Sequence, residues 1–137
     1  MMNSISKALY RFWSGFGVPA YEEGRVPVRE TRGGLLEPVE PPYITYDVRY
    51  GEIFDTIPMV AINWHSATNG SSGSAERFAL MDKIAEAIPV EGIGIDLDNG
   101  GYLVLHRGPE FQADYNDPDD PSVIGGRTSY TMTYYTL

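Results

Sequence analysis

The densest group of possible ligand atoms in this sequence is an acidic run in its C-terminal part. Five carboxylate or carboxamide side chains fall within seven residues, at Asp114, Asn116, Asp117, Asp119 and Asp120. Such a run can bind a divalent cation weakly or accept Arg and Lys from a partner, but it is most often a solvated loop. The pattern therefore favours a solvated loop, with a partner contact as the second interpretation and an ion site as the third.

Two other features are weaker candidates for a metal site. Residues 96–100 have the spacing with which a calcium loop begins, but Arg107 stands at the twelfth position, where an acidic ligand is required. A hairpin turn explains the same residues without an ion. The two histidines, His65 and His106, fall on predicted strands, and their spacing indicates no shared metal. The sequence therefore predicts no metal site and no cofactor.

Signatures of covalent and nucleotide chemistry are also missing from the sequence. Without cysteine, the chain has no thiolate nucleophile, no disulfide and no cysteine-bound zinc. The serines in residues 71–74 lack the pattern of a nucleophile elbow, and no glycine-rich phosphate loop is present. We therefore expect a protein that is not an enzyme.

The net charge limits the kinds of partner that the surface can bind. Ten Lys and Arg stand against 19 Asp and Glu, which gives a formal net charge of −9. Tight nucleic-acid binding needs clustered cations, so this composition argues against it. The same charge suits an acidic wall past which DNA slides without sticking, or simple solubility. The length of 137 residues fits one domain. No apolar run approaches the roughly 18 residues needed to span a membrane, so we expect a cytosolic product without membrane contact.

The elements that position these residues begin with a predicted helix over residues 4–16. Its apolar residues recur at three- and four-residue spacing and share one face, namely Ile5, Ala8, Leu9, Phe12, Trp13 and Phe16. Ser4 is suited to cap the start of the helix, and Gly15 and Gly17 are suited to end it. This face can pack against the domain's own sheet or against a neighbouring subunit, and we favour the sheet.

Residues 18–42 are predicted to be a long irregular loop, because five prolines interrupt both helix and central strand. A loop of this length in a compact domain is usually functional or disordered. Its mixed charges suit a partner surface, and they are Glu22, Glu23, Arg25, Arg29, Glu30, Arg32, Glu37 and Glu40. A flexible loop is an equally good interpretation of its middle, residues 29–40.

The remaining elements follow from periodicity. Alternating apolar residues predict strands at 43–50, 57–66, 93–97, 102–107 and 127–137. The first two form an antiparallel ribbon, and the turn at 98–101 makes a hairpin of the next two. Between residues 74 and 89 lies a helix capped by Ser74, with the apolar stripe Phe78, Met81, Ile84, Ala85 and Ile88. Residues 67–73 and 108–126 are predicted loops.

This order of elements, helix, two strands, helix and three strands, indicates an α+β fold. The sheet is expected to be mainly antiparallel, with two helices packed on it, in the order α-β-β-α-β-β-β. The whole chain, residues 1–137, is expected to be one domain.

Several stretches, spread in the same order over most of the chain, together resemble small minor capsid proteins of long-tailed bacteriophages that are similar to tail terminators. Residues 10–27 (YRFWSGFGVPAYEEGRVP) are the most specific of these stretches, followed by residues 42–46 (PYITY). Weaker matches are Trp64, Gly100–Gly101, Arg107–Gly108 and residues 117–120. The chain departs from the family pattern by an inserted run, residues 28–41, to which no family property can be transferred.

The resemblance implies a tail-terminator-like fold and a structural role in the virion. Such a protein forms a ring, expected to be a hexamer of itself, on the last ring of the major tail-tube protein. It stops tube growth and offers its other face to the head–tail connector or stopper protein, while genomic DNA passes through the ring without specific binding. The protein would be assembled in the host cytoplasm and would reside at the head–tail junction.

We expect subunit or partner contacts at the aromatic helix face, at the start of the long loop and in the acidic run. The residues concerned are Phe12, Trp13, Tyr21, Glu22, Glu23, Arg25, Asp117, Asp119 and Asp120. If Trp13 and Tyr21 form such contacts, alanine at either position weakens the ring and leaves a folded monomer.

Alternative functions come from other classes of protein. A tail-tube or head–tail connector subunit would share much of the fold, but a tube subunit stacks on copies of itself. A metal-dependent hydrolase built on the acidic run would lose activity on chelation. A small ligand-binding module would need a closed apolar pocket.

Overall fold

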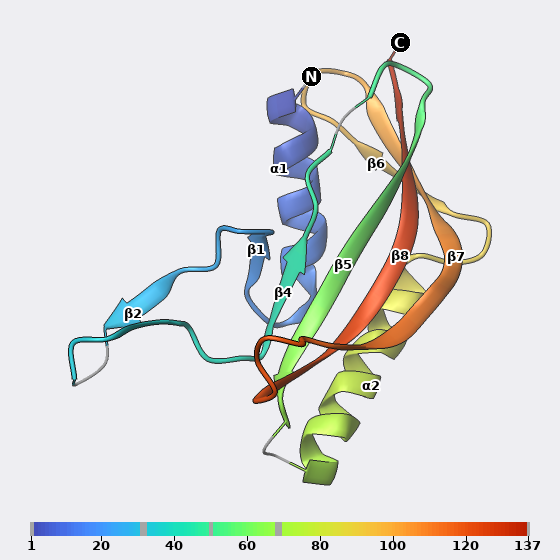
Figure 1. The fold of residues 1–137 in the computed structure, drawn as a ribbon. Helices are drawn as coiled ribbons and strands as arrows, with labels where there is room; N and C mark the ends of the chain where they lie inside the picture. The colour runs from blue at the N-terminus through green and yellow to red at the C-terminus, as the bar shows by residue number, and fades with distance from the viewer. Residues whose placement is uncertain (1, 31–32, 50, 68–69, 137) are drawn as a thin grey trace.

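A curled six-stranded sheet, mainly antiparallel, dominates the computed structural model, which describes residues 2–30, 33–49, 51–67 and 70–136 (Figure 1). Across these residues the sheet carries two α-helices, and a separate two-stranded hairpin stands beside it. The expected α+β class with a mainly antiparallel sheet is therefore confirmed. Within the described part of the chain, no helix is long and apolar enough to cross a membrane.

The helical elements are α1 (Met2–Trp13), the short 3-10 helix η1 (Ser14–Phe16) and α2 (Gly70–Ala87). In spatial order the sheet contains β1 (Ala20–Glu22), β4 (Tyr43–Tyr46), β5 (Thr56–Ser66), β8 (Val123–Tyr135), β7 (Tyr102–Asn116) and β6 (Ile93–Asp96). The hairpin pairs β2 (Val28–Glu30) with β3 (Leu36–Pro38). Strand β1 runs parallel to β4, and the other neighbours in the sheet are antiparallel.

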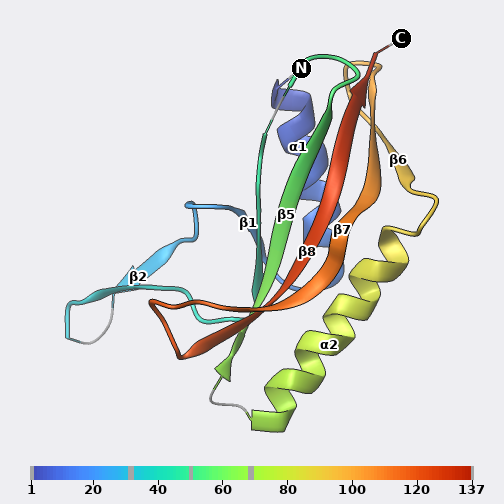
Figure 2. The same ribbon diagram turned by 45° about the vertical axis from the view of Figure 1, so that its right-hand side comes forward.

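Both helices cover the same face of the sheet, and the core lies between them and the strands (Figure 2). Directly paired residues of neighbouring strands share a face, as Met59 does with Tyr130 and Leu105 with Met132. All four are buried, as the alternation of apolar residues predicted for these strands. Among the described elements, no helix covers the opposite face of the sheet.

Helix α1 packs on the sheet through the predicted aromatic face, as we favoured. Leu9 and Trp13 are fully buried, and the Trp13 indole donates a hydrogen bond to the Tyr130 hydroxyl at 3.2 Å. The predicted helix start at Ser4 is wrong, because α1 already begins at Met2 and the buried Ser4 hydroxyl donates to Asp98 instead of capping. That contact ties α1 to the hairpin turn after β6.

Helix α2 starts earlier than predicted. Residues 70–73, predicted as part of a loop, belong to the helix, so Ser74 is not its cap. Serine and glycine have weak helix propensity, so the local sequence did not indicate a helix at these residues.

The buried stripe of α2 agrees with the prediction except near its start. Met81, Ile84 and Ile88 are buried as predicted, but Phe78 is 49% exposed. Arg77 is buried in its place, so the expected position of Phe78 in the stripe is wrong. The reason is that a polar side chain occupies the face toward the sheet, where an apolar residue was expected.

Strand β7 corrects the predicted loop at 108–126. The β7–β8 pairing continues past residue 107, with a register shift between Arg107 and Gln112, and the connecting turn shrinks to residues 117–122. Pro109 falls inside this bulge, where its missing N–H breaks no ladder hydrogen bond. Glu110, at φ 48°, makes the bend. The hairpin of β6 and β7 around residues 97–101 is confirmed.

Residues 18–42 are also more ordered than the predicted loop. Strand β1 pairs with β4 in the register Ala20 to Ile44, and β2 with β3 forms a hairpin that Val39 extends by donating to the Pro27 carbonyl. We call residues 26–39 the arm. Its described part projects away from the sheet and helices in both views (Figures 1 and 2). Strand β4 ends at Tyr46, four residues before the predicted end, and residue 50 lies outside the described residues.

Candidate functional site

A groove of about 530 Å³ lies on the face of the sheet opposite the helices, at the base of the arm. We call it the acidic groove. Its floor consists of half-buried apolar and aromatic side chains, namely Tyr43, Ile62, Trp64, Tyr115 and Val123. Its rim carries four carboxylates, at Glu23, Glu40, Asp117 and Asp120. Segments far apart in the sequence thus meet around one hollow.

The aromatic floor depends on a glycine at the centre of the sheet. Gly125 pairs in register with Trp64 on one side and with Tyr115 on the other, so the three share a face. The Trp64 and Tyr115 rings approach edge to face with centroids 5.5 Å apart. A Cβ on residue 125 would lie 2.7 Å from Ile62 Cγ2 and 3.4 Å from the Trp64 ring. The missing side chain therefore leaves room for the floor.

The floor side chains are held in place by contacts with neighbouring residues. The Trp64 indole donates to the Thr45 hydroxyl at 3.0 Å, which fixes the ring against β4. Tyr43 contacts Tyr21 of β1 with ring centroids 5.8 Å apart. The groove is therefore built on strands, with rings whose positions are set by their neighbours.

The rim makes the groove electrostatically negative. Asp117 accepts the Asp119 N–H at 2.9 Å, and Asp120 accepts the Ser122 N–H at 3.0 Å, so both carboxylates shape the β7–β8 turn. Hydrogen bonds from Ser122, its hydroxyl first, lower the pKa of Asp120 and keep it charged. Burial, followed by the negative charges of Asp120 and Asp117, raises the pKa of Tyr43. A cationic group is the natural ligand for such a surface.

Glu23 extends the acidic rim toward the start of β5. Its pKa is raised by a hydrogen bond with Asp47 and by the negative charge of that carboxylate. Asp47 is buried, accepts the Val60 N–H at 3.3 Å, and pairs with Arg49 at 3.3 Å. The Arg49 charge thus offsets part of this pair, while Glu23 still lines the groove.

The structure brings together five of the nine expected contact residues. Glu23, Asp117 and Asp120 line the acidic groove, Asp119 lies in the same turn, and Tyr21 packs behind Tyr43.

The other expected contacts lie elsewhere. Arg25 pairs with Glu22 at 3.3 Å, and Glu22 also accepts from the Ser6 hydroxyl at 3.1 Å, beside α1. Phe12 is half-buried against Trp13, with ring centroids 4.9 Å apart. Trp13 itself is 0% exposed. Its expected role in a subunit contact is therefore wrong, because its ring is buried in the domain's own core.

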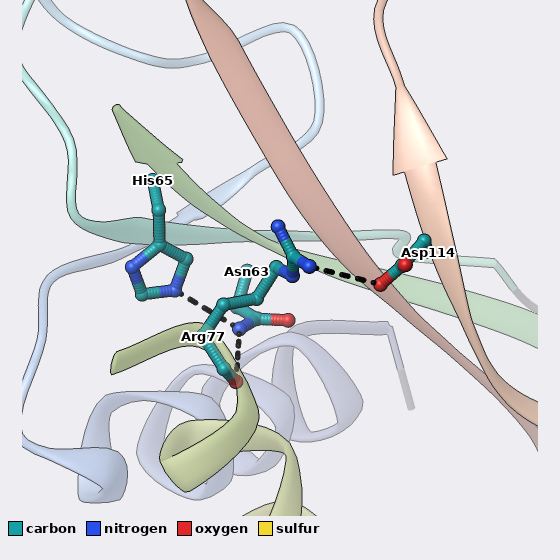
Figure 3. Close-up of polar contacts among 4 residues, drawn as sticks. All are labelled: Asn63, His65, Arg77 and Asp114. Carbon is teal, nitrogen blue, oxygen red and sulfur yellow. Dashed lines mark hydrogen bonds and ion pairs between the residues drawn. The ribbon is translucent and has the colours of Figure 1, made fainter. Parts of the chain in front are cut away.

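A second polar cluster lies under α2, in the part of the helix nearest its start (Figure 3). The Asn63 amide donates to His65 Nε2 at 3.1 Å and to the Arg77 carbonyl at 3.4 Å, while the Arg77 guanidinium pairs with Asp114 at 3.3 Å. Because the amide nitrogen is a donor, Nε2 accepts and the imidazole is neutral. Burial, opposed by Glu76 and aided by Arg77, lowers the pKa of His65.

This cluster packs α2 against the sheet, and several of its buried polar atoms make no hydrogen bond. Among the described residues, Asn63 Oδ1, His65 Nδ1, and Arg77 Nε and Nη1 have no hydrogen-bond partner. A Cβ at Gly126 would lie 2.6 Å from both Asn63 Oδ1 and Met81 Sδ, so the cluster encloses no room for a ligand there.

Arg107 of β7 fastens the far end of the same helix. The carbonyls of Ala85 and Ile88 accept from its guanidinium at 2.9 and 2.7 Å. Because these carbonyls have no partner further along the helix, the arginine also caps the end of α2. The polar groups under α2 thus hold the helix on the sheet.

Neither region has the ligands of a metal centre. In the part of the chain that the structure describes, no group of three or more His, Cys, Asp or Glu side chains is placed to hold a metal ion. His65 is buried under α2, and His106 is exposed on β7. What the acidic groove can do chemically is bind a cationic, partly apolar segment.

Two parts of the groove were missed in the sequence. Tyr115 was placed in a predicted loop, although Phe111, Ala113 and Tyr115 alternate with polar residues as in a strand. The association of Glu23 with the acidic run depends on the strand order β4-β5-β8-β7, which no local pattern encodes.

Comparison with known proteins adds no family to these observations: no protein-family model, no curated protein and no solved structure matches the chain.

Proposed function

We propose that this chain is a structural protein of a long-tailed bacteriophage, a tail terminator whose subunits close into a hexameric ring. The ring would cap the tail tube, stop its polymerisation and join it to the head–tail connector around the DNA channel. The family is suggested by the resemblance at residues 10–27 and 42–46. In the fold these two stretches meet, because β1 lies in the first and pairs with β4 in the second.

Two unlike surfaces, both open to solvent in the single chain, carry the proposal. One protrudes, since the arm bears Val28, Leu35 and Leu36 at 58%, 71% and 72% exposure. The other is hollow, namely the acidic groove. Large apolar side chains left in water mark an interaction surface. Unlike surfaces on one subunit form head-to-tail contacts, and such contacts close into rings when the rotation between subunits allows.

The charge of the chain supports the same assembly. A net charge of −9 per subunit would surround a DNA channel with negative potential. Phosphates would then pass without being held, because no counterions are released by binding. The proposal needs no catalytic group.

Arrest of tube growth tests this proposal. Purified chain is added at increasing ratio to polymerising tail-tube subunits, and tube lengths are measured by electron microscopy. A terminator shortens the tubes and leaves one ring at a tube end. Tubes of unchanged length with bare ends contradict the proposal, and tubes that incorporate the chain along their length identify a tube subunit.

A small binding module for a cationic ligand is the second candidate, because the groove combines aromatic rings with carboxylates. It predicts a monomer that ignores tube ends. Titration with arginine and with short arginine-containing peptides, followed by tryptophan fluorescence, would detect such binding independently of any ring. Loss of the signal in Trp64→Phe would assign it to the groove and not to the buried Trp13.

A further inference from the structure

We infer that the arm of one subunit lies in the acidic groove of the next copy of this chain, which makes it the contact that closes the ring. The inference rests on the proposed ring and names the surfaces that form it. It concerns residues 28–41, the insertion that sets this chain apart from the family that it resembles.

Apolar surface is present on both sides of the contact. Val28, Leu35 and Leu36 of the arm are each more than half exposed. The groove offers rings and aliphatic groups that are only half-buried, at Trp64 and Tyr115 above all. Contact between these two surfaces removes apolar area of both from water, which favours association.

The charges of the two sides are compatible. The arm, residues 26–39, contains two arginines and two glutamates, so it has no formal net charge in a chain whose total is −9. Four carboxylates surround the groove. A segment without net charge meets this acidic rim without the repulsion that two strongly negative surfaces would exert on each other.

The direction of the arm selects a neighbouring groove. Val26 and Val39, at the base of the arm, form one wall of the groove of their own subunit. From this wall the arm projects away from the sheet and helices in both views (Figures 1 and 2). At about 3.3 Å per residue, the segment from Val26 to Glu30 extends roughly 13 Å from this wall. A subunit therefore reaches another subunit's groove and not its own.

Disulfide trapping tests the contact directly, because the chain has no cysteine of its own. One protein carries Leu36→Cys in the arm and a second carries Val123→Cys in the groove floor. Mixed and oxidised, they should form a covalent dimer. Each protein alone should not. A mixture of Val90→Cys with Val123→Cys is the matched control, because Val90 is 78% exposed but lies after α2, away from the arm.

A non-covalent test uses variants that keep the fold. Leu35→Asn with Leu36→Asn should weaken self-association about tenfold or more, whereas Val90→Asn should not change it.

The outcomes separate this inference from the proposed function. Rings that form without a crosslink between positions 36 and 123 and tolerate asparagine at positions 35 and 36 overturn the arm contact and leave the terminator proposal standing. A crosslink in open chains or dimers that ignore tube ends supports the arm contact and overturns the terminator. If no crosslink forms and the chain assembles neither by itself nor on tube ends, both the arm contact and the terminator proposal are overturned.

Discussion

Helix α1 and the arm both carry large apolar side chains, but those of α1 are buried and those of the arm are exposed. Leu9 and Trp13 of α1 are 0% exposed, whereas Leu35 and Leu36 of the arm are more than two-thirds exposed. Burial of an apolar side chain stabilises the fold by about 1.5–3 kcal/mol relative to exposure. Stability should therefore reside in α1 and its contacts, and assembly in the arm. Substitutions on either side can break this division.

The largest effect is expected at Trp13. Replacement by alanine removes a fully buried indole and leaves a cavity, so Trp13→Ala should lower the free energy of unfolding by about 3–5 kcal/mol. Urea unfolding followed by circular dichroism measures it. Tyr10→Ala on the same helix, where the side chain is 55% exposed, should cost less than about 0.5 kcal/mol. Equal stability of the two variants would contradict the burial of Trp13 in the core.

A smaller loss is expected when the hydroxyl beneath α1 is removed. Tyr130→Phe leaves the Trp13 indole N–H buried without its acceptor, so unfolding should become easier by about 1–3 kcal/mol. The same denaturation measurement applies. Tyr102→Phe, on a ring at 36% exposure, is the control. A Tyr130→Phe protein as stable as this control would show that the hydrogen bond is not formed.

The attachment of α2 should depend on pH through His65. Its pKa is lowered in the fold from the ordinary value of 6.5, so below this pH the unfolded chain binds a proton that the folded chain resists. Stability should therefore be unaffected by His65 above pH 6.5. It should decline as the pH falls toward the folded pKa, by at most about 1.4 kcal/mol per pH unit.

The variant His65→Gln isolates this contribution. Its stability between about pH 7.5 and 5.5, the range around the ordinary histidine pKa, should be flatter than that of the wild type by the slope attributed to His65. Parallel curves for the two proteins would mean that the imidazole titrates as freely in the fold as in the unfolded chain. His106→Gln, exposed on β7, serves as the matched control.

The smallest effect on stability is expected in the arm. Leu35→Asn with Leu36→Asn replaces side chains that lie mostly in water, so the monomer should unfold within about 0.5 kcal/mol of the wild type. Thermal unfolding at a concentration below self-association is the measurement. A large loss of stability would mean that the arm packs on its own domain. It would contradict the assignment of stability to α1 and of assembly to the arm.

The sequence predicted the parts of the fold that repeat locally. Helix α1, strand β5, the β6–β7 hairpin and the C-terminal strand follow from regular spacing of apolar residues, because one buried face imposes that spacing. Strand β1 and the arm could not be predicted, since three-residue strands among prolines leave no periodicity. Phe78 was misplaced in the stripe of α2 because Arg77, a charged residue, takes a buried position against Asp114.

The acidic groove was predictable only in its composition. Glu23, Asp117 and Asp120 were candidates for a partner surface, but that they surround one hollow depends on strand order and on Gly125. Trp13 shows the converse error. An aromatic residue on an amphipathic helix is as well suited to a core as to an interface, and only the packing of Tyr130 against it decides.

Native mass spectrometry of the purified protein, alone and on addition of tail-tube ends, would decide whether the arm closes a ring. We predict a closed species near six times the 15.2 kDa of one chain, formed alone or on tube ends and lost when the arm leucines are replaced. A monomer that ignores tube ends, or a ladder of ever larger stacks, would contradict a closed ring.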